Sequence, residues 1–141
     1  MAAKYFNQPN AMFAQVRSIA HAAATATEVI GLAIIPCDAE IISIDFIPDG
    51  ATTGNDTNRT NLNVMNRGIL GTGTTELGNL DLATGSDLTA FKREAVYNPS
   101  TKLRVVAQSV IAIQFEKVGT GVAVSAGTWI IEFRPMGQID S

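Results

Sequence analysis

Cysteine and histidine are almost missing from this chain of 141 residues. The single cysteine, Cys37, excludes a disulfide within the chain, and it lies between two apolar runs, where a buried and inert thiol is expected. The single histidine, His21, lies in an alanine-rich segment, where we expect a mobile or interface-packed imidazole and not a catalytic base. A zinc site would need several cysteine and histidine ligands, so none is expected.

Charge is also scarce. Charged residues make up 16% of the sequence, and the net charge is −3 with a pI near 5.0. The ten basic residues are scattered, which disfavours binding to nucleic acid or to an anionic membrane. No apolar run approaches the length of roughly 18 residues that a membrane span needs, and polar residues between Asn7 and Arg17 interrupt any signal-peptide core. We expect a soluble protein made in the cytoplasm, part of whose sparsely charged surface is covered by partners.

Motifs for catalysis are lacking too. The segment GILGTGTT at residues 68–75 has no lysine after its last glycine and no helix pattern behind it, so it predicts a tight turn and not a phosphate loop. No nucleophile-elbow motif is present. The segment PDGATTGNDTN at residues 48–58 lacks the spacing of a calcium loop, and side-chain-stabilised turns explain its asparagines and aspartates. We expect no enzymatic activity, no cofactor and no metal.

Alternation of apolar and polar residues is the strongest pattern from residue 27 onward. This period of two predicts about eight strands, separated by turn-rich segments and without interleaved helices. The pattern is typical of an antiparallel β-sandwich, here residues 27–141, and we expect a jelly roll. The predicted strands are 28–35, 41–48, 60–66, 75–80, 93–97, 103–107, 110–118 and 128–135. The expected inward side chains are Ile30, Leu32, Ile34, Ile42, Ile44, Phe46, Leu62, Val64, Ile111, Ile113, Phe115, Trp129, Ile131 and Phe133.

Residues 1–26 differ from the rest and are interpreted as an N-terminal arm. They are rich in alanine and show no clear strand pattern, and the helical spacing of Met12, Val16 and Ile19 is compatible with a short amphipathic helix. Two or three helical turns are not stable alone, so the arm is expected to lie on its own domain or on a neighbouring subunit. Both remain open. The candidate anchors of the arm are Tyr5, Phe6, Met12, Phe13, Val16 and Ile19.

Several turn motifs resemble those of a known group of proteins. The run DTNRTNLNVMNRGILGTGTTELGNL, followed by LATGSDLTAF and VGTGVAVSAGTWIIEF, is similar to small jelly-roll proteins encoded beside tailed-phage capsid genes. The matching motifs are Asn66-Arg67-Gly68, Gly71–Thr75 and Val118–Gly121, and the resemblance covers about residues 27–134. Ser125-Ala126-Gly127 stands where that group usually has Pro-Gly before the last strand.

The resemblance implies a capsid decoration, or cement, protein of a bacteriophage. Such proteins lie on the outer surface of the virion, commonly as homotrimers, and clamp neighbouring subunits of the major capsid protein. The protein would then be made in the cytoplasm of the host bacterium, and no catalytic residue would be carried over. A homotrimer is the favoured state, with a dimer left open. Arg67 is the polar contact expected to touch a partner, against the alternative of a solvated charge at the end of a strand.

A carbohydrate-binding sandwich of a phage fibre or adhesion module is the alternative function. A sugar site needs an exposed aromatic ring with amides nearby. Trp129 alternates with Ile131 and Phe133, so it is expected in the core, which leaves Tyr5 and Tyr97 as candidate platforms.

Overall fold

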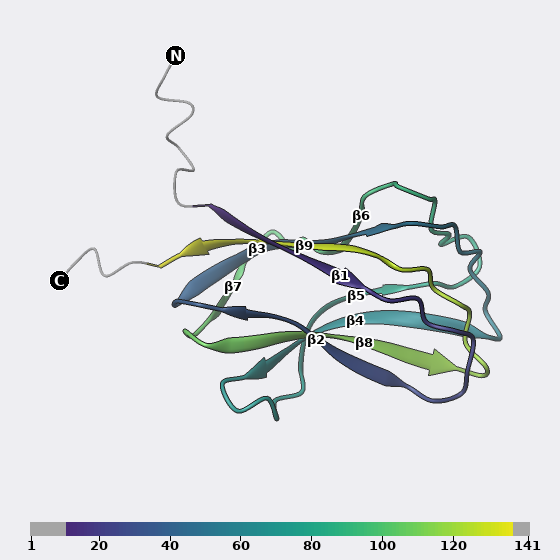
Figure 1. Cartoon of the computed structure of the whole chain (residues 1–141), viewed down its shortest axis with the longest axis horizontal. Helices are drawn as coiled ribbons and strands as arrows, with labels where there is room; N and C mark the ends of the chain where they lie inside the picture. Colours follow the sequence, from purple (N-terminus) through teal and green to yellow (C-terminus); the bar gives the residue numbers. More distant parts are fainter. Residues whose placement is uncertain (1–10, 137–141) are drawn as a thin grey trace, which may run out of the picture.

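The computed structural model describes residues 11–136, which fold into two antiparallel sheets packed face to face (Figure 1). Nine strands form in this part of the chain. They are β1 (Met12–Ser18), β2 (Glu28–Ile35), β3 (Ala39–Pro48), β4 (Arg59–Gly68), β5 (Thr75–Asp81), β6 (Glu94–Tyr97), β7 (Leu103–Val105), β8 (Ser109–Val118) and β9 (Gly127–Pro135).

The two layers have different strand orders. One sheet runs β1-β9-β3-β6, and β7 also pairs with β3; the facing sheet runs β2-β8-β4-β5. Every strand pair is antiparallel. The predicted antiparallel β-sandwich is therefore confirmed, and each of the eight predicted strands has its counterpart among β2 to β9.

The core lies between the sheets and follows the predicted alternation most closely on the two long C-terminal strands. Ile111, Ile113 and Phe115 of β8 are buried, and so are Trp129, Ile131 and Phe133 of β9. Trp129 is completely buried and stacks on Phe46 of β3, with ring centroids 4.6 Å apart. The prediction that Trp129 belongs to the core is confirmed.

Two β-bulges correct the predicted inward residues on β2 and β3. The pairing of β2 with β8 shifts between Gly31 and Ala33, and the pairing of β3 with β9 shifts between Ile41 and Ser43. A bulge inserts one residue into a strand, so the side chains on its two sides no longer follow one alternation. As a result Ile35 and Ile41 are fully buried, whereas Ile34 is exposed and Ile42 is half-buried.

The short helix considered for the N-terminal segment is wrong. Residues 12–18 form β1, which pairs with β9 through seven consecutive residues from Met12↔Phe133 to Ser18↔Gly127. An isolated helix of this length is unstable, whereas an edge strand gains a full set of ladder hydrogen bonds from β9. This part of the predicted arm thus belongs to the five-stranded sheet. Tyr5 and Phe6 lie outside the described residues.

Tyr97 ends β6 with its ring in the core. Its side chain is almost completely buried, and its hydroxyl oxygen accepts a hydrogen bond of 2.8 Å from the backbone N–H of Leu103. This bond ties the 98–102 loop to the sheet. Burial raises the pKa of Tyr97 above its usual value of 10.0, because a buried phenolate would lose its hydration.

Tyr97→Phe is expected to change how stability depends on alkaline pH. A pKa raised in the folded state gives stability that is fully present below about pH 10 and is lost as pH rises through the folded pKa. The free energy of unfolding of the native chain should therefore fall, relative to the variant, over a range that begins near the usual pKa of 10.0 and extends above it. At neutral pH the variant should be less stable by about 1 kcal/mol, since the Leu103 hydrogen bond is lost. Denaturant titrations at both ends of this range would measure the difference, and parallel curves would contradict the assignment.

Candidate interaction surfaces

β1 is the edge of the five-stranded sheet and carries four of the candidate anchors on it or next to it. Val16 is half-buried against the core of its own domain, as is Ala14. Met12 and Phe13 are exposed, with 58% of Phe13 accessible, and Ile19 beyond the strand is exposed as well. The chain's own sandwich therefore takes up Val16 and leaves the other three described anchors free to meet a partner.

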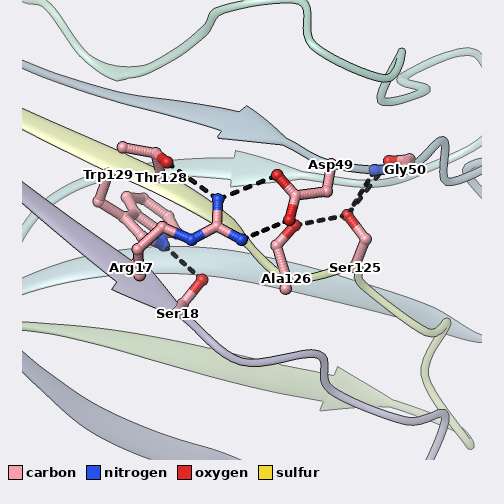
Figure 2. A network of polar contacts seen from close by, with 8 residues as sticks. All are labelled: Arg17, Ser18, Asp49, Gly50, Ser125, Ala126, Thr128 and Trp129. Atoms are coloured by element: carbon pink, nitrogen blue, oxygen red, sulfur yellow. Dashed lines mark hydrogen bonds and ion pairs between the residues drawn. The ribbon is translucent and has the colours of Figure 1, made fainter.

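The C-terminal end of β1 is held by a hydrogen bond inside the molecule. The indole N–H of Trp129 donates to the hydroxyl oxygen of Ser18 over 3.1 Å (Figure 2). Both residues are buried, so this bond satisfies the one polar atom of the largest core side chain. It also fixes where β1 ends on the sheet.

Arg17, the neighbour of Ser18, holds β1 from the other face of the sheet. Its guanidinium group forms a two-pronged ion pair with Asp49, at 2.5 and 3.0 Å, and donates to the Thr128 hydroxyl at 3.0 Å (Figure 2). The hydrogen bond from Arg17 lowers the pKa of Asp49 below its usual 3.8, so the pair persists well into the acid range. Because both groups are exposed, the contact positions β1 more than it stabilises the fold.

The segment before β9 completes this network. The Ser125 hydroxyl accepts from the Gly50 N–H at 2.9 Å, and the Asp49 N–H donates to the Ala126 carbonyl at 2.8 Å. At Gly127 a Cβ would lie 2.4 Å from the ring of Phe46, so only glycine lets the backbone approach the core this closely. Close packing against Phe46 therefore requires the glycine of the Ser125-Ala126-Gly127 turn.

His21 corrects the expectation of a mobile or interface-packed imidazole. Its ring is buried and stacks on Phe115 with centroids 3.7 Å apart, and its backbone pairs with Val124 through two hydrogen bonds of 2.8 Å. Its Nδ1 lies 2.7 Å from a carboxylate oxygen of Glu28. His21 therefore stabilises the segment between β1 and β2, which joins the two sheets of one chain. Its position in the sequence does not indicate this role.

Arg67 lies on the other sheet, near the end of β4, and the structure does not bring it to the β1 anchors. Its Nε donates to the Gly71 carbonyl at 3.1 Å, so part of its hydrogen-bonding capacity is used within its own loop. Gly68 and Gly71 have φ angles of 71° and 74°, a region that suits glycine. The predicted turn at residues 68–75 is confirmed.

The tip of this turn carries two apolar side chains that were not singled out as a candidate surface. Ile69 and Leu70 are exposed, Leu70 to 85%. The sequence feature that could have indicated this surface is the pair of adjacent aliphatic residues inside an otherwise glycine- and threonine-rich turn. Exposed aliphatic pairs at a loop tip commonly mark contacts with partners.

Most exposed large apolar residues gather at one end of the sandwich, here called the β2–β3 end. Cross-strand pairing places Met12, Phe133, Ile41 and Leu103 in one row of the five-stranded sheet, and Ile34, Val110 and Gly68 in one row of the facing sheet. Both rows lie at the end on the left of Figure 1, where the β2–β3 connection and the β4–β5 turn are found. Of the eleven exposed large apolar residues in the described part of the chain, this end holds seven. They are Met12, Phe13, Ile34, Ile69, Leu70, Leu103 and Val106.

Two grooves at the same end are too small for a typical ligand site. One has a volume of about 240 Å³ and is lined by Asp38, Ala39, Arg104, Val105, Val106 and Met136. The other has about 130 Å³ and is lined by Ala11, Glu40, Ile42, Lys102 and Arg134. Sites for small molecules usually have at least about 300 Å³, so these grooves suit side chains of a partner better than a free ligand.

The oxygen-rich loop is explained by its own hydrogen bonds. The Asn55 side-chain oxygen accepts from the N–H groups of Thr57 and Asn58, both at 2.8 Å, and Asp56 accepts from the Thr84 N–H at 2.9 Å. These side-chain-stabilised turns are the predicted ones. Within residues 11–136 there is no group of three or more histidine, cysteine, aspartate or glutamate side chains placed to hold a metal ion.

Comparison with protein-family models, with curated proteins and with solved structures found no match. Among the described residues, no helix has the length and apolar character required to span a bilayer. The resemblance to phage decoration proteins therefore depends on the turn motifs alone.

Ser18→Ala is expected to destabilise the protein by about 1–3 kcal/mol, because it leaves the buried indole N–H of Trp129 without an acceptor. Denaturant unfolding would measure the loss, and hydrogen exchange of the β1 amides should become faster. Ser18→Thr keeps a hydroxyl and should retain part of the stability. Ser100→Ala, at an exposed position, is the matched control. Equal effects of the two alanine variants would show that the Ser18 bond contributes nothing.

Proposed function

We propose that this protein is a structural virion protein that binds the outer surface of a phage capsid and stabilises the lattice by clamping neighbouring major capsid subunits. The observation that carries the proposal is the β2–β3 end, because seven exposed apolar side chains and two small grooves are found at this end of the sandwich. Exposed apolar surface that is concentrated in one region of a protein is typical of a contact with a partner. Leu70, Ile69 and Phe13 have the size and exposure of anchor residues at such contacts.

The strand order supports the jelly roll that we propose for the fold. From β1 to β4 the chain alternates between the two sheets. The complete orders are β1-β9-β3-β6 and β2-β8-β4-β5, with β7 continuing the edge that β6 begins along β3. If β6 and β7 count as one interrupted strand, there are eight strands in two four-stranded sheets, as in jelly rolls of capsid proteins. The turn motifs of the resemblance lie at the ends of these strands.

Capsid stabilisation would follow from mass action. A protein that binds only the assembled lattice adds its binding free energy to the assembled state, and every bound copy must be released before subunits separate. The rigid sandwich suits this function because little ordering is required on binding. The virion location and synthesis in the bacterial cytoplasm belong to the same proposal, as does the homotrimer, with a dimer open.

The carbohydrate-binding alternative finds little support in the described residues. Trp129 is fully buried and Tyr97 is 2% exposed, so neither can serve as a sugar platform. Tyr5 lies outside the described residues.

Replacing Ile69 and Leu70 together by aspartate should weaken binding to DNA-free, expanded capsids of the encoding phage by roughly tenfold or more, because charges would replace two exposed apolar contacts. Co-sedimentation at increasing protein concentration would measure the affinity. Phe91→Asp is the matched control, since Phe91 is also a highly exposed apolar residue but lies at the opposite end, next to Pro48.

Equal binding by both variants and the native chain would remove the β2–β3 end from the interface. Absence of binding by the native chain would overturn the proposed function, and saturable binding to a glycan array would then favour the carbohydrate-binding module.

A further inference from the structure

The described sheets have several free edges, and all but one carry a feature that discourages pairing with another chain. β2 has a bulge between Gly31 and Ala33, and the β4–β5 ladder shifts register where β5 contributes the extra residue Leu77. β6 has four residues with a register shift, and β7 has three residues. Short strands and bulges are the usual protection against edge-to-edge association.

β1 has no such protection. It pairs with β9 over seven consecutive residues without a register shift, and its sequence MFAQVRS contains no proline, glycine, lysine or acidic residue. Among the described residues, the backbone groups of Met12–Ser18 have no partner strand other than β9. One side of β1 therefore presents a straight row of unpaired N–H and C=O groups beside exposed apolar side chains.

We propose that β1 is a pairing surface for a second copy of this chain, with the two β1 strands antiparallel and Gln15 on the twofold axis. This register opposes Met12 to Ser18, Phe13 to Arg17, Ala14 to Val16, and Gln15 to the Gln15 of the other copy. Residues directly opposite in an antiparallel pair lie on the same face, so the two five-stranded sheets become one continuous sheet.

The side chains of β1 complement themselves in this register. Arg17 is the only charged residue of the strand, and the residue opposite it is Phe13, so no like charges face each other across the pair. The Arg17 guanidinium is paired with Asp49 and Thr128 on the β9 side of the strand, so its charge is satisfied within the chain and does not oppose pairing at the free edge. On the inward face, Ala14 and Val16 are half-buried and Met12 is exposed, and pairing extends the core across all three.

Moving the axis by one residue, to Ala14 or to Val16, would be less favourable, because only five residues of each β1 would then face the other strand in place of seven. Self-pairing of one strand also generates a closed twofold dimer, since each copy uses its single β1 edge. This state differs from the homotrimer that the resemblance implies. Met12 and Phe13 belong to both proposed surfaces, but the test of this inference is independent of capsid binding because it is made on the free protein.

The experiment replaces Gln15, which lies on the proposed twofold axis, by a charged residue. Gln15→Lys and Gln15→Glu each place like charges directly opposite one another in the pair, whereas a mixture of the two variants places opposite charges there. Gln15 is exposed, so both variants should fold like the native chain, which circular dichroism and thermal unfolding would verify. Sedimentation equilibrium of the full chain and of each variant would give the mass and the dissociation constant.

The native chain is expected at twice the chain mass of 14.9 kDa. Each single variant should raise the dissociation constant by roughly fivefold or more, and an equimolar mixture of the two should restore it to the native value or below. A native monomer, a native trimer, or a dimer that neither charge weakens would overturn the proposal. A dimer weakened by both charges but not restored by mixing would exclude the register centred on Gln15, and with it the proposal in this form.

Discussion

Trp129 joins three strands of the five-stranded sheet, and the placement of β1 depends on it. The ring is fully buried and stacks on Phe46 of β3, while its N–H bonds to Ser18 at the end of β1. A buried indole needs both contacts, because its area favours the core and its N–H requires an acceptor. The stacking of Trp129 on Phe46 also requires Gly127, because any side chain at position 127 would collide with the Phe46 ring. The positions of β1, of the turn before β9 and of the core side chains therefore depend on the same set of contacts around Trp129.

The alternation of side chains in the sequence was sufficient to predict the sheets but not their irregularities. On β8 and β9 every predicted inward residue is buried, because both strands lie inside their sheets and are paired on both sides. On β2 and β3 one bulge each moved burial from Ile34 to Ile35 and from Ile42 to Ile41. A bulge arises from the fit between two strands, so no single strand's pattern contains it.

β1 was missed for a related reason. Met12 and Val16 are four residues apart, a spacing that satisfies both a helix and a strand, and alanines around them favour neither strand nor core. Contacts with residues that are distant in the sequence favour the strand over the helix: Ser18 and Trp129 are 111 residues apart, and Arg17 and Asp49 are 32 apart. His21 shows the same limit, because its stacking on Phe115 is a tertiary contact. The turn at residues 68–75 was predictable since its glycines act locally, whereas the exposure of Leu70 depends on where the turn lies on the sandwich.

The two proposed surfaces share Met12 and Phe13 at the start of β1, and the rest of the β2–β3 end lies beyond the paired strands. β1 begins with Met12 at the β2–β3 end and runs toward the opposite end of the sandwich (Figure 1). Antiparallel pairing of two β1 strands therefore directs the two β2–β3 ends away from each other along the strand axis. A dimer of this kind would present its apolar surfaces at its two extremes, where each can contact a different subunit. If both proposals hold, clamping follows from bivalency: once one end is bound, the second binds at the high effective concentration set by a rigid spacer, without new contacts at either end.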